Sequence, residues 1–324
     1  MIILTGAAGF IGTMVASSLN QQGRDDLILV DDFASSYKPL RDPSLKYLEL
    51  VDREQLSLWI DAHHSEVEHI IHLGARTDTT EFDWDIFLRL NLHFTQRLWE
   101  QCTEYQIPLI YASSAATYGA GELGYNDDHD IVEQLQPLNP YGRSKNDFDK
   151  WALNQVRKGL CPPHWYGLKF FNVYGPYEYH KGRMASVVLH TYENVLRTGH
   201  MDLFRSHRPD FKDGMQLRDF VYVKDVASVI LFLCEKHPVN GLYNVGTGQA
   251  QSFLELAHAT FDSMERPRDI SFIDIPEDIR DKYQYFTEAN ISKLRKAGYD
   301  KPFHNLRSGV FDYVTNYLNK HNFN

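Results

Sequence analysis

The sequence predicts an α/β protein with a doubly wound parallel sheet and a second, smaller α/β domain. Three observations lead to this prediction. An apolar segment at Met1–Thr5 passes directly into a glycine-rich turn, strand-like and helix-like segments then alternate along the first half of the chain, and the composition changes after residue 171. Such alternation is typical of βαβ units, whose strands pair in parallel and whose helices cover both faces of the sheet.

The alternation extends over the first 171 residues. Short apolar runs indicate buried strands, and apolar residues at helical spacing indicate the helices between them. The predicted strands are Met1–Thr5, Asp26–Val30, Val67–Leu73, Pro108–Ser113 and Trp165–Phe171, and the predicted helices are Ile11–Gln21, Phe87–Tyr105 and Tyr141–Lys158. Strand-like character returns at Asp219–Val223 and Leu242–Val245.

The second domain is predicted from the change in composition. Residues 172–217 are rich in Tyr, His, Arg, Gly and Pro, which suits loops and short helices around a ligand. Because strand-like segments follow this region, we expect the chain to pass between two lobes. The sheet domain should comprise residues 1–171 and about 218–247, and a substrate-binding domain should comprise about 172–217 and 248–324.

Charge and cysteine content exclude several classes of protein. The 324 residues carry 43 acidic and 33 basic side chains, which argues against a nucleic-acid or anionic-membrane surface. Three separated cysteines indicate free thiols, and the 15 histidines show no metal-ligand spacing, so we expect no metal. No apolar run is long enough to span a bilayer, and no basic segment precedes the first apolar run; the expected location is the cytoplasm.

The turn after the first predicted strand has the composition of a phosphate-binding loop. Its glycines, spaced G-x-x-G-x-x-G, allow a tight turn and a close backbone approach to a pyrophosphate at the N-terminus of the next helix. This context of strand, turn and helix predicts a dinucleotide site on a Rossmann-type sheet. The residues of this turn predicted to bind the cofactor are Gly6, Gly9, Phe10, Ile11 and Gly12.

Charged residues after the second predicted strand bear on the identity of the dinucleotide. Asp31 and Asp32 lie about 20 residues after Gly12, where a carboxylate accepts hydrogen bonds from the adenosine ribose, which favours NAD. Lys38 and Arg53 follow and could bind the 2′-phosphate of NADP. These residues leave both cofactors open.

A tyrosine and a lysine four residues apart suggest acid–base chemistry. Tyr141 and Lys145 would share one face of a helix that begins at Pro140. A nearby ammonium stabilises a phenolate, so we expect Lys145 to lower the pKa of Tyr141. Ser114, at the end of a predicted strand, could bond the reacting hydroxyl beside the tyrosine.

Four motifs in a fixed order resemble the extended short-chain dehydrogenase/reductases. They are T-G-A-A-G-F-I-G, S-S-A-A-T-Y-G, Y-x-x-x-K and F-N-V-Y-G-P. The resemblance implies that Ser114, Tyr141 and Lys145 are the catalytic set. Dehydratases of this family usually carry Thr-Asp-Glu where this chain has Ser114, Ala115 and Ala116, so elimination of water is disfavoured.

Several segments resemble one subfamily, the ADP-L-glycero-D-manno-heptose 6-epimerases of lipopolysaccharide biosynthesis. They are Tyr111–Gly119, Phe171–Pro176, His180–Gly182, Met184–Ser186, Arg218–Val223, Tyr283–Thr287 and Ala297–Phe303. This resemblance implies that NADP, with NAD possible, takes a hydride from C6″ of the sugar and returns it to the opposite face of the ketone. It also implies two acid/base residues, Tyr141 and Lys181; without the resemblance, Lys181 is more simply a surface charge.

The same resemblance implies further contacts. The substrate-binding set is Ser114, Asn172, Arg183, His190, Arg218 and Tyr283, and the added cofactor contacts are Leu73, Gly74, Ala75, Asn91 and Val173. From the residues alone, Arg218 could instead pair with Asp219, and Tyr283 could be a core residue. The resemblance further implies a homo-oligomer, as a pentamer. The alternatives are a UDP-hexose 4-epimerase and a non-catalytic NADP-binding sensor.

Overall fold

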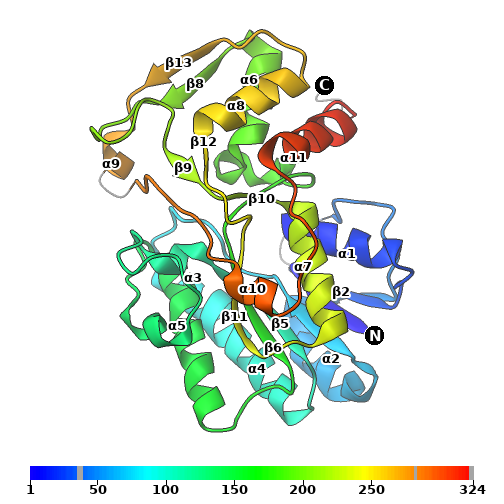
Figure 1. The fold of residues 1–324 in the computed structure, drawn as a ribbon. Coiled ribbons are helices and arrows are strands. Elements are labelled where there is room, and N and C mark those ends of the chain that lie inside the picture. Colours follow the sequence, from blue (N-terminus) through cyan, green and yellow to red (C-terminus); the bar gives the residue numbers. More distant parts are fainter. Residues whose placement is uncertain (35–38, 281–282, 321–324) are drawn as a thin grey trace.

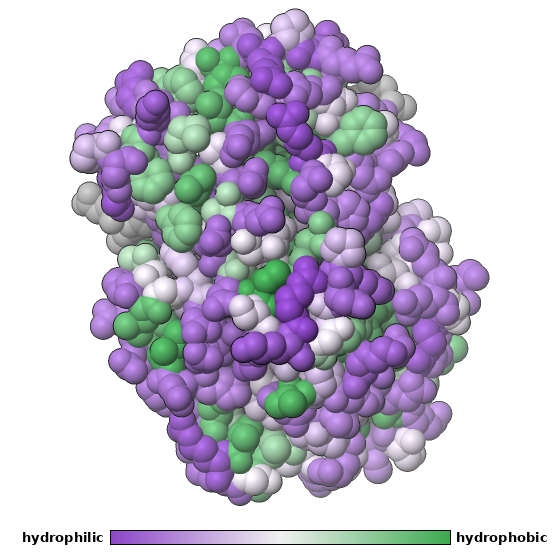
Figure 2. Space-filling view, in the orientation of Figure 1, coloured by the Kyte–Doolittle hydropathy of each residue, from purple (hydrophilic) through white to green (hydrophobic). Residues whose placement is uncertain are grey.

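The chain folds into two lobes in a computed structural model that describes residues 1–34, 39–280 and 283–320 (Figure 1). Lys38, one of the predicted cofactor contacts, lies outside the described residues. The face of the molecule seen in Figure 2 is mostly hydrophilic, with scattered apolar residues. Within the described part of the chain, no helix combines the length and the apolar character that crossing a membrane requires.

A seven-stranded parallel sheet forms the larger lobe, in the order β11-β6-β5-β4-β1-β2-β3. Its strands are β1 Ile2–Thr5, β2 Leu27–Asp31, β3 Glu49–Asp52, β4 His69–His72, β5 Leu109–Ser114, β6 Trp165–Phe170 and β11 Gly241–Val245. The strand order reverses between β1 and β4, and the crevice at such a switch point is where ligands bind in this fold. The predicted fold class is confirmed; β3 was not predicted.

Helices bury both faces of this sheet. Helices α1 Phe10–Gln21 and α7 Val223–Lys236 pack on one face, where Leu4, Leu29 and Ile71 point. The opposite face, with Ile3 and Ile28, is covered by three helices. They are α2 Leu56–His63, α4 Phe94–Glu104 and α5 Pro140–Arg157. Burial on two sides explains why these strands are almost uniformly apolar.

The helix predicted at Phe87–Tyr105 is interrupted. Helix α3 Trp84–Phe87 is followed by a π-helical stretch, Leu88–His93, before α4 begins. Such wider turns are frequent at functional sites, because they turn a side chain away from the regular helical face. Here the stretch carries Asn91, whose side chain is buried.

The smaller lobe consists of helices and three two-stranded sheets. The strand pairs are β7 Asn172–Tyr174 with β10 Phe220–Tyr222, β8 Met201–Phe204 with β13 Ile270–Ile273, and β9 Leu217–Arg218 with β12 Gln251–Ser252. The helices are α6 Val187–Thr198, α8 Phe253–Ser263, α9 Glu277–Arg280 and α11 Leu306–Tyr313. Helix α10, Ser292–Lys296, returns to pack against β11 of the large sheet, so the chain crosses between the lobes more than once.

Candidate active site

Three glycines bring the turn after β1 close to the loop after β4. Gly6 has φ +70°, and a Cβ there would lie 2.7 Å from the backbone nitrogen of Gly74. A Cβ on Gly12 would lie 2.1 Å from the carbonyl oxygen of Gly6. A side chain at Gly6 would push the turn away from the loop after β4, and one at Gly12 would push α1 away from the turn, so both positions require glycine.

The first turn of α1 is suited to an anion. Gly9 caps the helix without a side-chain hydrogen bond, and no acidic residue lies in the first turn, so the backbone N–H groups and the positive helix end have no competing carboxylate there. Phe10 and Ile11 begin this helix, with Phe10 buried. The geometry fits the pyrophosphate of a dinucleotide.

The carboxylates at the end of β2 have different partners. Asp31 accepts hydrogen bonds from the backbone nitrogens of Ala8 at 3.0 Å and Asp32 at 2.8 Å, so it ties the glycine turn to β2. Asp32 lies 3.5 Å from Arg53, which also approaches Glu54. An acidic and a basic group thus lie together where the adenosine ribose would bind.

Asn91 holds two parts of the site together. Its amide oxygen accepts from the backbone nitrogen of Arg76, and its Nδ2 donates to the carbonyl oxygen of Arg76 and to Ser144. Both N–H groups of Nδ2 are thereby used within the protein. Asn91 fixes the loop that carries Leu73–Ala75 against α5, next to Lys145.

The structure brings Ser114, Tyr141 and Lys145 together at the carboxyl end of β5. Asn139 caps α5 by accepting from the backbone nitrogen of Gly142 at 2.8 Å, which sets Tyr141 in the first turn. Tyr141 is hydrogen-bonded to Ser114. The Nζ of Lys145 is buried and donates to the carbonyl oxygen of Ala112 at 2.9 Å.

The electrostatics of this cluster differ from the prediction in one respect. Burial raises the pKa of Tyr141, and the hydrogen bond from Ser114 only partly opposes this. The expected lowering by Lys145 is therefore wrong for the protein alone, because removal from water penalises the phenolate more than its neighbours stabilise it. Burial also lowers the pKa of Lys145 to about 8, against the opposing charge of Asp149.

Lys181 lies beside the glycine turn on a half-buried loop. Its Nζ is 5.2 Å from the centre of the Phe10 ring, and the residue belongs to the 3₁₀ segment Tyr179–Met184. Burial lowers the pKa of Lys181, while the charge of Glu178 raises it. A freely solvated lysine would show neither effect.

Glu178, which the sequence did not single out, closes the loop that carries Lys181. Its buried carboxylate accepts from the backbone nitrogen of Gly175 at 3.2 Å and from both the nitrogen and the hydroxyl of Ser186 at 2.6 Å. One side chain thus joins both ends of the segment. A lone acidic residue in a loop offers no sequence signal of this role.

Arg218 is a buried guanidinium without a carboxylate partner among the described residues. It donates to the backbone carbonyls of Leu217 and Gln284 and lies 5.4 Å from the Tyr283 ring centre. The possible pair with Asp219 is wrong, because that carboxylate accepts from the backbone nitrogens of residues 247, 248 and 289. An unpaired buried cation favours an anionic ligand.

The other predicted substrate contacts are more dispersed. Asn172 is exposed on β7, next to the partly buried Val173. His190 is partly exposed on α6, and the exposed Arg183 donates to Thr80, in the segment after β4. Tyr283 is partly exposed and packs against Phe204 and Tyr285, so it combines a core contact with an accessible face.

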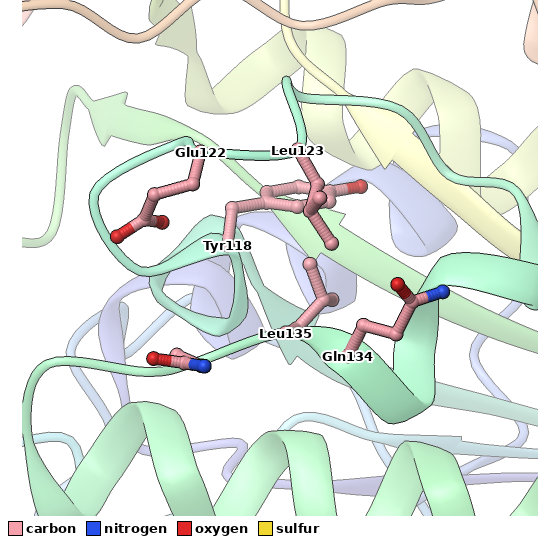
Figure 3. A pocket seen from close by; sticks show the side chains of 6 residues that line it. Tyr118, Glu122, Leu123, Gln134 and Leu135 are labelled. Atoms are coloured by element: carbon pink, nitrogen blue, oxygen red, sulfur yellow. The ribbon is translucent and has the colours of Figure 1, made fainter.

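A hollow of about 450 Å³ lies beside Tyr118, in the short helical segment Ala115–Tyr118 that follows β5 (Figure 3). It is lined by Tyr118, Glu122, Leu123, Gln134, Leu135 and Gln136. Gly119, which follows Tyr118, accepts a hydrogen bond from the side chain of Gln284, whose carbonyl also receives Arg218. Only Tyr118 lies in a motif that the sequence indicated. No group of three or more metal-binding side chains occurs in residues 1–34, 39–280 and 283–320.

Comparison with known proteins defines the class. Residues 2–246 match the NAD dependent epimerase/dehydratase family, and the chain belongs to this family. It is 47% identical to the ADP-L-glycero-D-manno-heptose-6-epimerase of Fusobacterium nucleatum, over 99% of this chain and 98% of that protein. The family's cofactor is a nicotinamide dinucleotide, in agreement with the glycine turn.

Solved structures support the same class. The Helicobacter pylori ADP-L-glycero-D-manno-heptose-6-epimerase superimposes with a TM-score of 0.79 at 27% identity, covering 97% of this chain and 94% of that one. MoeE5, solved with UDP-glucose and NAD, superimposes with a TM-score of 0.76 at 26% identity, covering 97% of both chains. The resemblance to the heptose epimerases noted in the sequence is confirmed.

Proposed function

We propose that this protein inverts C6″ of ADP-D-glycero-D-manno-heptose through a transient 6″-ketone, as an isomerase of lipopolysaccharide biosynthesis. The observation that carries this proposal is Lys181. It lies half-buried beside Phe10, so that the cofactor site has a second group able to exchange a proton in addition to Tyr141. Two such groups would allow one to take the hydroxyl proton on one face of the carbon and the other to return a proton on the opposite face.

The residues around the glycine turn would hold the dinucleotide. The pyrophosphate would lie at the N-terminus of α1, and Asp31 and Asp32 would face the adenosine ribose. Arg53 already pairs with Asp32, and Asp31 adds a second negative charge at the same place. The net negative charge disfavours the 2′-phosphate of NADP, so these residues support NAD. NADP is the alternative, with Arg53 and Lys38 at its 2′-phosphate. Leu73–Ala75 and Val173 would border the nicotinamide half.

A bound nicotinamide would supply the hydride acceptor and donor for C6″. In its phenolate form, Tyr141 would take the hydroxyl proton as the ketone forms, and Ser114 would hydrogen-bond the same oxygen. Lys145 stabilises the phenolate and binds the ribose hydroxyls. After the ketone has turned, Lys181 supplies the proton to the new hydroxyl. Asn172, Arg183, His190, Arg218 and Tyr283 would hold the sugar nucleotide.

The direct test is incubation with ADP-D-glycero-D-manno-heptose, with NAD⁺ and NADP⁺ supplied in separate reactions. Chromatography or NMR that resolves the two C6″ epimers should show conversion to a mixture. No conversion with either cofactor would overturn the proposal. Turnover of UDP-galactose instead would support a UDP-hexose 4-epimerase, and tight cofactor binding without any turnover would support a sensor.

Replacement of Arg218 should weaken substrate binding more than catalysis. Arg218→Gln removes the buried cation that would bind the diphosphate, and a charge-assisted bidentate contact accounts for about 10- to 100-fold in affinity. We expect KM for the ADP-heptose and the Kd of ADP to rise by this factor, with kcat nearly unchanged. Arg268→Gln, at an exposed arginine paired with Asp262, is the matched control. An unchanged KM in R218Q would contradict a contact between Arg218 and the diphosphate.

A homo-oligomer, as a pentamer, and a cytoplasmic location complete the proposal. Both rest on the resemblance to the heptose epimerases. Light scattering on the purified protein measures the mass of the assembly directly. A monomer in solution would contradict the first of these proposals.

A further inference from the structure

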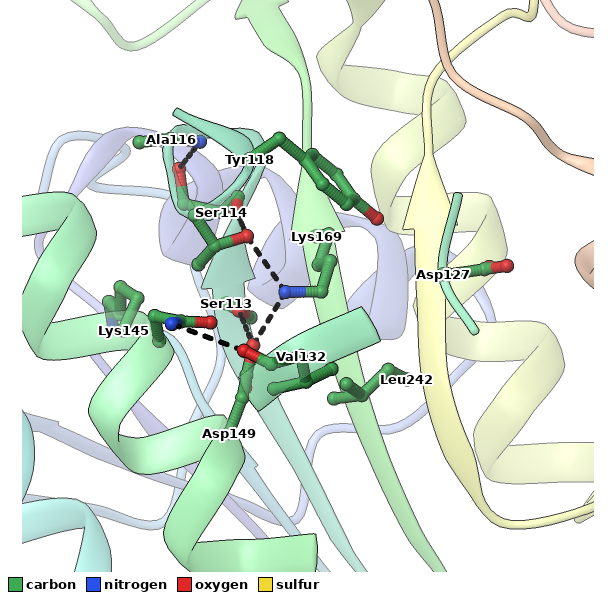
Figure 4. A network of polar contacts seen from close by, with 12 residues as sticks. Ser113, Ser114, Ala116, Tyr118, Asp127, Val132, Lys145, Asp149, Lys169 and Leu242 are labelled. Carbon is green, nitrogen blue, oxygen red and sulfur yellow. Dashed lines mark hydrogen bonds and ion pairs between the residues drawn. The ribbon is translucent and has the colours of Figure 1, made fainter. Parts of the chain in front are cut away.

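A fully buried ion pair lies beneath the catalytic cluster (Figure 4). The Nζ of Lys169, on β6, is 2.7 Å from an Oδ2 of Asp149, on α5, and both side chains have no exposed surface. Among the ion pairs of the described chain, only this one is completely hidden on both sides. Burying a charge pair contributes little net stability on average, so its retention calls for another explanation.

Hydrogen bonds connect this pair to β5, the strand that ends at Ser114. Asp149 accepts from the hydroxyls of Tyr111 at 3.0 Å and Ser113 at 2.7 Å, both on β5. Lys169 also donates to the hydroxyl of Thr117 at 2.8 Å, and that hydroxyl donates to the carbonyl oxygen of Ser114 at 2.8 Å. Figure 4 shows these groups converging below Ser114. The pair thus fixes the backbone of the residue that bonds Tyr141.

The pair also faces the ammonium of Lys145. Asp149 follows Lys145 by four residues on α5, hence on the same helical face. Lys145 is buried, its bond is to the neutral carbonyl of Ala112, and no carboxylate of the described residues pairs with it directly. Its nearest compensating charge is therefore Asp149, which Lys169 partly balances.

Four further titratable groups near Lys145 or Asp149 are neutral near pH 7. Burial lowers the pKa of His72, on β4, to about 3, and that of His129, beside β6, to about 4. Burial raises the pKa of Tyr141, on its own helix, and of Tyr111, on β5. Asp149 is then the charge that favours the ammonium of Lys145, and Lys169 is the ion that balances Asp149.

We propose that the Asp149–Lys169 pair is a positioning element of the active site, which anchors Ser114 through Thr117 and holds Lys145 as an ammonium by supplying a partly balanced negative charge. This inference rests on the proposed roles of Ser114 and Lys145. Removing Asp149 leaves Lys169 as an unbalanced positive charge near Lys145. Removing Lys169 leaves Asp149 unbalanced, with the opposite effect. Removing both restores the balance.

The test is an NMR titration of the protein with ¹³Cε-labelled lysine, in which Lys145→Arg identifies the Lys145 resonance. Wild type should titrate at Lys145 with a pKa of about 8. In Asp149→Asn the midpoint should fall by about one pH unit, and in Lys169→Met it should rise by about as much. Asp149→Asn/Lys169→Met should return close to wild type. The alkaline limb of epimerisation should move in the same directions, because activity needs the ammonium.

Equal Lys145 midpoints in all four proteins, or shifts of one sign in both single variants, would overturn the inference. Asp312→Asn, which breaks a partly buried pair with Lys224 elsewhere, should leave the midpoint unchanged. Circular dichroism verifies folding, and Lys169→Met alone still tests the sign if Asp149→Asn does not fold. The titration needs no substrate, so a lack of turnover of ADP-heptose by wild type would count against the proposed function only.

Discussion

Tyr141→Phe is expected to lower kcat for C6″ epimerisation by about 10²- to 10⁴-fold, the range that a positioned acid/base contributes. The substitution removes only the hydroxyl that bonds Ser114 and leaves the ring in the first turn of α5. Because the aromatic ring remains, the fold and cofactor binding should be preserved. Initial rates at saturating substrate, measured by separation of the epimers, give the effect.

Two measurements show whether a lower rate reflects lost catalysis rather than lost cofactor binding or the removal of any tyrosine hydroxyl. Fluorescence titration of the nicotinamide cofactor should give a Kd close to that of wild type. Tyr105→Phe, which removes an exposed hydroxyl bonded to Asp61, should retain full activity. Wild-type turnover in Y141F would show that Tyr141 is not an acid/base of the reaction. Lys181 would then be the remaining candidate.

Lys181→Met is expected to reduce epimerisation by about 10²-fold or more while leaving chemistry on one face of the sugar intact. Methionine keeps the length of the side chain against Phe10 and removes the charge, so the loop closed by Glu178 should remain folded. Absorbance of the reduced cofactor in a single turnover should still be detectable. In the double variant with Tyr141→Phe, this half-reaction should also disappear.

Lys212→Met, at an exposed lysine, is the control for loss of one positive charge. Full epimerisation by K181M would contradict a two-base mechanism. Loss of cofactor binding in K181M would instead assign the lysine to binding, since it lies beside the glycine turn. The two outcomes are separated by comparing the cofactor Kd with kcat.

Much of the fold follows from local sequence signals. The apolar runs at β1, β2, β4, β5 and β6 and the alternation with helices predicted the parallel sheet, and the positions of the glycines predicted the turn before α1. These features depend on near neighbours along the chain, through backbone sterics, hydrophobic periodicity and helix starts. The four-residue spacing of Tyr141 and Lys145 is of the same kind.

The direction in which the pKa of Tyr141 is shifted could not be predicted from the sequence. The expected lowering at Tyr141 considered its neighbour on the helix but not the desolvation imposed by the packing around it. The π-helical stretch at Leu88–His93 was equally invisible, since its apolar spacing resembles an ordinary helix. Burial depends on which distant segments pack together.

The sequence by itself determined the Rossmann-type sheet, the dinucleotide turn, the tyrosine–lysine pair and the family resemblance. Only the tertiary structure decided the charge partners. Arg218 bonds backbone carbonyls and does not pair with Asp219, and Lys181 lies against Phe10. Asp149 and Lys169 form a buried ion pair beneath Ser114. The reason is physical: a charged side chain takes its state from groups within a few ångströms, and those groups come from elements far apart in the sequence.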